Sequence, residues 1–122
     1  MSEGRRARRV AELLRMHVTQ LIARELGDPS LDALVITTVD VPDDLSVARI
    51  GVRLMVGDDD DKARKRSLRS LHRASGRLRR MLAPRLELRR VPELSFSYDT
   101  GHDAERRVEE LLEEIHAESP ED

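Results

Sequence analysis

The sequence predicts a single α+β domain in which helices pack on one face of a small three-stranded sheet. The length, 122 residues, is the usual size of one domain. Apolar residues recur at helical spacing in some stretches and alternate strictly in others. These stretches follow one another as helix, strand, strand, helix, possible break, helix, strand and helix.

The first predicted helix is amphipathic and ends at a glycine. Its apolar residues follow the i, i+3, i+4, i+7 pattern: Val10, Leu13, Leu14, Val18, Leu21 and Ile22. Gly27, Asp28 and Pro29 form the stop. Cations at a helix N-terminus oppose the helix dipole. We therefore expect residues 1–9 to be a basic arm ahead of a domain that spans residues 10–116, with residues 117–122 as a frayed acidic tail.

Two strands follow and form a hairpin. Residues 34–41 are rich in β-branched side chains, and residues 42–44 read as a turn. From residue 47 to 56 every second residue is apolar in strict alternation, which predicts one buried apolar face and one solvent-exposed face. The apolar face consists of Ala48, Ile50, Val52, Leu54 and Val56, whereas Arg49 and Arg53 lie on the other face, where we expect them to be solvated.

The second half of the chain predicts a long helical region, a strand and a last helix. One of the aspartates at residues 58–61 should cap a helix that starts near Lys62. A break is expected at residues 74–76, and Pro84 disfavours a regular helix through its own position. The third strand alternates over Leu94, Phe96 and Tyr98. The acidic last helix carries its apolar face on Val108, Leu111, Leu112 and Ile115.

Charge is concentrated in blocks although the net charge is only −2. Residues 62–90 contain 12 basic residues and one acidic residue, and no acid occurs from Lys62 to Leu86. A solvated helix face normally mixes both signs, because opposite charges at i and i+4 stabilise it. A concentrated positive field in a neutral chain favours a polyanionic partner.

On a helical wheel the basic residues of this block gather on one side. Lys62, Lys65, Arg66, Arg69, Arg73 and Arg80 fall within about 60° of Arg69, and Gly76 lies in the same sector. Leu68, Leu71, Ala74, Leu78 and Leu82 lie on the opposite side. The wheel therefore predicts a phosphate-binding face rather than a merely solvated one. Arg5, Arg6, Arg8 and Arg9 form a second basic cluster.

Other functional classes receive little support. The absence of cysteine excludes disulfides, thiolate zinc sites and cysteine nucleophiles. The four histidines have no ligand spacing, and no nucleotide or hydrolase motif occurs. Single strands cannot be held mainly on aromatic residues, because the chain has one Phe, one Tyr and no Trp. We expect a non-enzymatic cytoplasmic protein without cofactor, metal or membrane association.

Several short motifs, taken in order, resemble the bacterial ribosome-binding factor A family. They are residues 25–29 (Glu-Leu-Gly-Asp-Pro), 44–46 (Asp-Leu-Ser), 74–76 (Ala-Ser-Gly), 91–94 (Val-Pro-Glu-Leu), Phe96, Tyr98 and Asp99. The resemblance covers about residues 5–115. It implies a type II KH-like domain in which Ala74, Ser75 and Gly76 form a kink between two helices in place of the GxxG loop.

The resemblance also implies a function. Members of this family assist late maturation of the small ribosomal subunit, including growth in the cold, and bind its 16S rRNA. The expected RNA-binding residues are Arg5, Arg6, Arg8, Arg9, Lys62, Lys65, Arg66, Arg69, Arg73, Ala74, Ser75, Gly76, Arg77 and Arg80. Expected partners of this monomer are the 30S subunit, ribosomal proteins and assembly GTPases. Two alternatives remain: another KH-like RNA-binding factor, or a protein-interaction adaptor acting through the acidic last helix.

Overall fold

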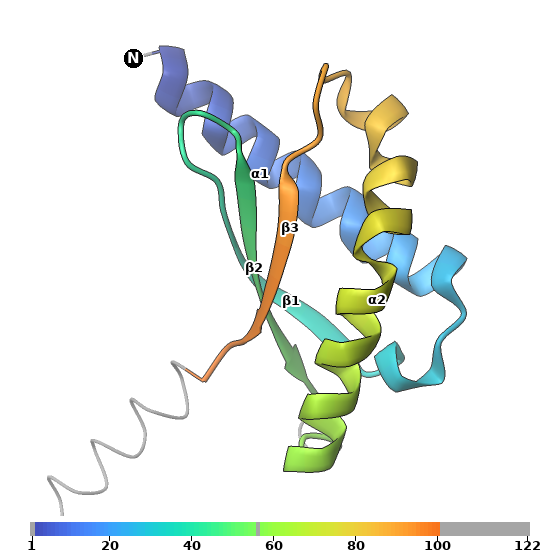
Figure 1. Ribbon diagram of the computed structural model, residues 1–122. Helices are drawn as coiled ribbons and strands as arrows, with labels where there is room; N and C mark the ends of the chain where they lie inside the picture. The colour runs from blue at the N-terminus through green and yellow to red at the C-terminus, as the bar shows by residue number, and fades with distance from the viewer. Residues whose placement is uncertain (1, 56, 101–122) are drawn as a thin grey trace, which may run out of the picture.

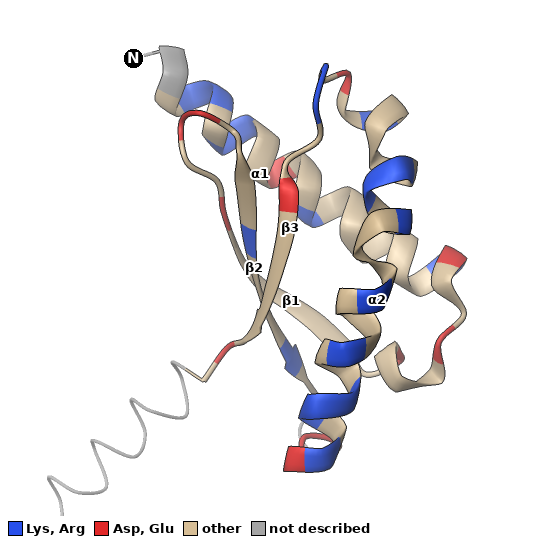
Figure 2. Cartoon of the chain, in the orientation of Figure 1, with Lys and Arg blue, Asp and Glu red and all other residues tan. Residues whose placement is uncertain are grey.

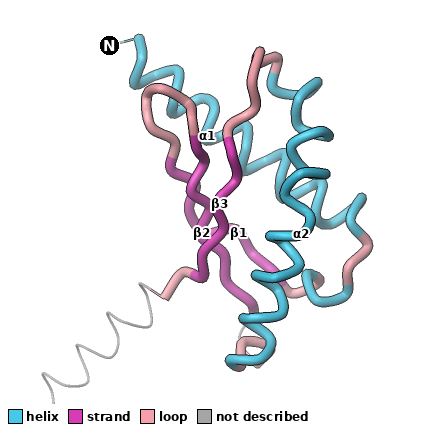
Figure 3. Tube along the Cα trace, viewed as in Figure 1, coloured by secondary structure: helices cyan, strands magenta, loops and turns pink. Residues whose placement is uncertain are grey.

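Two long helices lie on one face of a three-stranded sheet in the computed structural model, which describes residues 2–55 and 57–100 (Figure 1). The two helices contact each other; the first also contacts β1, and the second also contacts β3 (Figure 3). In chain order the elements are α1 (Ser2–Leu21), a π turn (Ile22–Leu26), a 3₁₀ turn (Pro29–Leu31), β1 (Leu34–Asp40), β2 (Val47–Leu54), α2 (Asp61–Leu86) and β3 (Glu93–Tyr98). The predicted α+β class is confirmed.

Helix α1 buries one apolar stripe and stops at the predicted place. Val10, Leu14, Val18 and Leu21 are buried on the same side. Gly27 follows the π turn in the left-handed conformation (φ 59°), which glycine adopts without steric cost. The chain then turns at Asp28 and Pro29 into β1.

Residues 2–9 of the expected basic arm are instead the first turns of α1, which begins at Ser2. Ala7 and Val10 are each 5% exposed and continue the buried stripe to the start of the helix. Burial of this stripe stabilises the first turns. It outweighs the unfavourable placement of cations near the positive end of the dipole, which costs only a few tenths of a kcal/mol to about 1 kcal/mol.

The hairpin matches the alternation seen in the sequence. β1 and β2 pair antiparallel, with a bulge between Ile36 and Thr38. Four members of the predicted apolar face are buried: Ala48, Ile50, Val52 and Leu54. The fifth, Val56, lies outside the described residues. Arg49 is exposed and Arg53 is half-buried on the other face.

Helix α2 is one uninterrupted helix. Asp60 caps it by accepting a hydrogen bond from the Ala63 amide at 2.8 Å, which confirms the predicted cap. The break expected at residues 74–76 does not occur, since the helix continues to Leu86 and passes through Pro84. Leu71, Leu78 and Leu82 are fully buried on both sides of the expected break, and this packing holds the helix in one piece.

Helix α2 connects two parallel strands. β3 pairs parallel with β2, so the sheet order is β1-β2-β3. Helix α2 is therefore the crossover that a parallel pair requires. Its buried leucines face the sheet, and the opposite side of the helix is exposed to solvent. The predicted last helix, residues 108–115, and the tail, residues 117–122, lie outside the described residues.

Candidate nucleic-acid interface

The cations predicted to share one face of α2 do so in the structure. Lys62, Lys65, Arg66, Arg69, Arg73 and Arg80 are all exposed, and we call this set the basic face. The Lys and Arg positions recur along the length of α2 in Figure 2. No ion pair joins the basic face to another residue of the described segments 2–55 and 57–100. Their placement is confirmed, while their contact with RNA stays a prediction.

Gly76 opens a gap in the basic face. It is exposed and keeps the negative φ of the helix. A methyl group built there would meet only Arg80 Nη1, at 3.7 Å. Ala74 and Ser75 are half-buried, and the Ser75 hydroxyl donates to the His72 carbonyl at 2.8 Å. Of the Ala-Ser-Gly motif, only the glycine therefore lies open on this face.

Two other arginines of residues 62–90 donate hydrogen bonds to backbone carbonyls within the fold. Arg77 donates through Nη2 to the Glu25 carbonyl at 3.1 Å, and Arg79 donates to the Val91 carbonyl at 2.9 Å. Arg77 was expected to bind RNA. It remains exposed, but this hydrogen bond holds its guanidinium near the end of α1.

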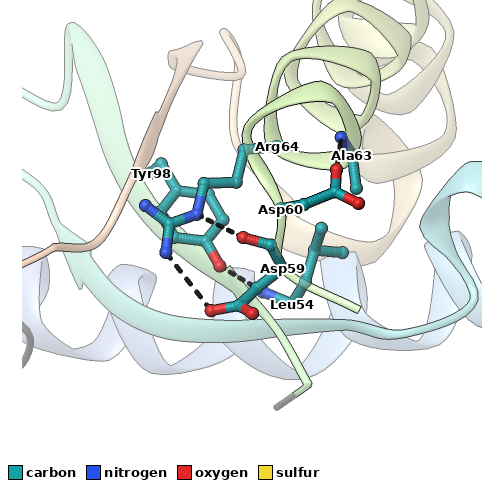
Figure 4. A network of polar contacts seen from close by, with 6 residues as sticks. All are labelled: Leu54, Asp59, Asp60, Ala63, Arg64 and Tyr98. Carbon is teal, nitrogen blue, oxygen red and sulfur yellow. Dashed lines mark hydrogen bonds and ion pairs between the residues drawn. The ribbon is translucent and has the colours of Figure 1, made fainter. Parts of the chain in front are cut away.

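Arg64 ties the start of α2 to the ends of β2 and β3 (Figure 4). Its guanidinium lies 4.4 Å from the centre of the Tyr98 ring and donates to the Asp59 carbonyl at 2.8 Å. It also pairs with the Asp59 carboxylate at 3.2 Å. The Tyr98 hydroxyl accepts a hydrogen bond from the Leu54 amide at 2.9 Å. This network fixes the first turns of α2 against the sheet, and with them the first residues of the basic face.

The second basic cluster lies on the other long helix, α1. Its arginines, Arg5, Arg6, Arg8 and Arg9, are exposed on the first turns of α1. Figure 2 places them at one end of the molecule and the start of α2 at the other. The first turns of α2 and this cluster therefore lie at opposite ends of the molecule.

A pocket that sequence reasoning missed lies beside the basic face. It measures about 340 Å³ and is lined by Leu26, Asp28, Ser70, Arg73, Ala74 and Arg77. Asp28 Oδ1 accepts hydrogen bonds from the Ser30 amide at 3.0 Å and the Ser30 hydroxyl at 2.7 Å. These bonds, led by the hydroxyl, lower the pKa of the Asp28 carboxyl below its usual value. In the sequence, Asp28 signals only a helix stop.

The described part of the chain has neither a metal-binding cluster nor a membrane-spanning helix. Residues 2–55 and 57–100 contain no cluster of three or more side chains suited to holding a metal ion. Neither helix in those residues is long and apolar enough to cross a bilayer.

A parallel β2–β3 pair bridged by a cationic helix defines the class of protein, a small KH-like α+β module with a basic helical face. Comparison with known proteins gives the family. The family model for ribosome-binding factor A matches residues 6–112. The chain belongs to the ribosome-binding factor A family, which confirms the resemblance seen in the sequence.

Relatives of known name cover nearly the whole chain. It is 49% identical over 111 residues to ribosome-binding factor A of Sorangium cellulosum, which covers 91% of this chain and 89% of that protein. It is 39% identical over 114 residues to the same factor of Syntrophobacter fumaroxidans, which covers 93% and 97%.

Solved structures agree with this assignment. The crystal structure of ribosome-binding factor A from Thermus thermophilus superposes with a TM-score of 0.64 at 29% identity, over 75% of this chain and 93% of that chain. A homology model of the Thermus factor, fitted into a cryo-electron microscopy map of its complex with the 30S subunit, gives a TM-score of 0.53 at 31% identity, over 71% and 92%.

Proposed function

We propose that this protein is a ribosome assembly factor that binds the small ribosomal subunit through its 16S rRNA, in the cytoplasm and without catalysing a reaction. Family membership supports the subunit as partner, since a related factor has been fitted into a map of a 30S complex. The observation that carries the proposal is the basic face, six exposed cations on a helix that has no acid from Lys62 to Leu86. Such a face suits a phosphate backbone.

The RNA backbone should approach the middle of α2 at Gly76. KH-type modules clamp the backbone where a glycine permits close contact. Arg69 and Arg73 precede this gap and Arg80 follows it, so phosphates on both sides of Gly76 can meet a guanidinium. We assign Ala74 and Ser75 to shaping the gap and Arg77 to its edge. Arg5, Arg6, Arg8 and Arg9 form a second, separate contact with phosphates.

The proposed partner predicts selective co-sedimentation. Mixed with a lysate fraction that contains immature small subunits, the protein should migrate with free small subunits at low salt. It should leave them as salt rises, because neutralised phosphates recover their counterions. Sucrose-gradient fractions probed for the protein measure this. Recovery only in the free-protein fractions, with immature subunits present, would contradict the proposal.

Replacing Gly76 by alanine should separate binding from folding. Because φ is negative and the added methyl meets only Arg80, the variant should fold and gain up to about 1 kcal/mol in unfolding free energy. Subunit binding should nevertheless fall several-fold, since the methyl group holds the phosphates away from the helix backbone.

Gly4→Ala is the matched control for this substitution. Gly4 also lies in a helix, and a methyl group there meets open space. It should raise the thermal midpoint in the same direction with little change in binding. If the Gly76→Ala protein binds subunits fully, Gly76 has no part in the interface and the cations carry all of it.

A further inference from the structure

The pocket beside the basic face contains groups of opposite charge in a fixed arrangement. Ser70, Arg73, Ala74 and Arg77 come from one stripe of α2, while Leu26 and Asp28 come from the turns that follow α1. Arg73 is also a member of the basic face. The pocket therefore opens where an RNA strand on that face would pass.

Hydrogen bonds within the fold hold one charged group on each side of the pocket, Arg77 and Asp28. Arg77 is held by the Glu25 carbonyl at 3.1 Å. Asp28 is held by Ser30, whose hydroxyl lies 2.9 Å from the hydroxyl of Ser70 on the opposite wall. Ser70 is itself only 8% exposed. Groups fixed in this way lose little conformational entropy when a ligand arrives.

We propose that this pocket receives one nucleotide of single-stranded RNA, with its phosphate against Arg73 and Arg77 and a hydrogen-bond donor of its sugar or base on the Asp28 carboxylate. The inference rests on the proposed function and adds a specific contact to it. Its volume, about 340 Å³, is near the lower end of the range of about 300–1,000 Å³ for small-ligand sites, which suits a single nucleotide.

The acidic group is what identifies the ligand. A carboxylate repels a bare phosphate, so a pocket for an inorganic anion would not place Asp28 opposite two arginines. A nucleotide carries both partners, because its phosphate accepts from guanidinium groups while its ribose 2′-hydroxyl or an exocyclic amine donates to a carboxylate. An ionised carboxylate offers about four lone-pair sites. Ser30 uses Oδ1.

Replacing Asp28 by asparagine tests the pocket through the sign of the effect. If nothing contacts Asp28, removing its negative charge lowers repulsion, and RNA binds equally well or more tightly. If Asp28 accepts a hydrogen bond from the nucleotide, RNA binding falls about tenfold despite the lower repulsion. Asparagine still caps the 3₁₀ turn through its side-chain oxygen. Dissociation constants for a single-stranded RNA oligonucleotide containing all four bases give the answer.

Asp44→Asn is a closely matched control. Asp44 Oδ1 accepts from the Ser46 amide at 3.0 Å and the Ser46 hydroxyl at 2.7 Å, the same arrangement as at Asp28. It lies in the hairpin turn, away from the pocket. Asp44→Asn should leave RNA binding unchanged or slightly tighter. An equal loss in both variants, or no loss in Asp28→Asn, overturns the proposal.

A second pair of variants decides the question if Asp28→Asn lowers the thermal midpoint below the assay temperature. Ala74→Leu fills the pocket without changing charge and should weaken RNA binding several-fold. It should also flatten the salt slope, because the phosphate held by Arg73 and Arg77 is displaced. Ala23→Leu is its control, since it fills a pocket of about 280 Å³ that includes no residue of α2. Full RNA binding by the Ala74→Leu protein overturns the proposal.

Comparing RNA with DNA identifies the donor, and the wild-type protein distinguishes a failed pocket from a failed proposed function. If the 2′-hydroxyl donates to Asp28, the loss in Asp28→Asn is seen with RNA and vanishes with DNA of the same sequence. If a base amine donates, Asp28→Asn weakens the binding of RNA and of DNA equally. A wild-type protein that binds neither RNA nor small subunits refutes the proposed function itself. A wild-type protein that binds while Asp28→Asn binds equally well refutes the pocket alone.

Discussion

Reversing two charges at the centre of the basic face, Arg69→Glu with Arg73→Glu, should weaken binding to small subunits on the order of 100-fold. Both side chains are exposed and precede Gly76. If five of the six cations meet phosphates, log K falls against log salt with a slope of roughly −3.5 to −4.5. Losing two contacts should flatten that slope by roughly 1.4 to 1.8. Titrations at several salt concentrations measure both quantities.

Arg85→Glu with Arg89→Glu is the control for net charge. These two arginines are exposed and belong to the basic block, but not to the basic face. The same change in total charge should weaken binding slightly through the long-range field and leave the slope intact. An equal loss in both double variants would show that RNA responds to total charge. In that case α2 does not form a defined interface.

Truncating Leu78 to alanine should have the largest effect on stability. Leu78 is fully buried on the side of α2 opposite the basic face. Leucine-to-alanine changes in cores cost about 2–5 kcal/mol, since both transfer free energy and a cavity contribute. The total free energy of unfolding of a domain of this size is only about 5–15 kcal/mol. Denaturant unfolding followed by circular dichroism measures the loss.

Binding should survive this truncation while the protein is folded. At a temperature well below its midpoint, Leu78→Ala should bind subunits nearly as the wild type does, because no cation has moved. Met55→Ala is the stability control: Met55 is 56% exposed, so its loss should change the unfolding free energy by no more than about 0.5 kcal/mol. A cost below 1 kcal/mol at Leu78 would contradict the packing described for α2.

Among the described residues, local patterns were sufficient to predict the strands and most helix ends, but not where α1 begins or that α2 is continuous. The three strands, the Gly27 stop and the aspartate cap all follow from local patterns, and each is present. The arm at residues 1–9 and the break at residues 74–76 were wrong for a common reason. In both places a modest local preference against helix competes with burial of an apolar stripe, and burial contributes more.

The site was predictable to the extent that it lies on one helix. A helical wheel places the six cations of the basic face on one side of α2, because spacing along the sequence alone determines which side of a helix a residue occupies. It cannot show that Arg64 stacks on Tyr98 or that Arg77 reaches the Glu25 carbonyl, because these contacts join segments far apart in the chain. Asp28 was missed for the same reason. Its neighbour across the pocket, Arg73, is brought there only by folding.

The parallel pairing of β2 with β3 makes the domain dependent on its late residues during synthesis. Val47 pairs with Glu93, so the sheet closes only after the whole of α2 has left the ribosome. Closing so long a loop is entropically costly and slows folding. A nascent chain that stops before β3 would carry every cation of α2 beside an unpaired edge of β2. It would bind polyanions and associate with other chains before it had a fold.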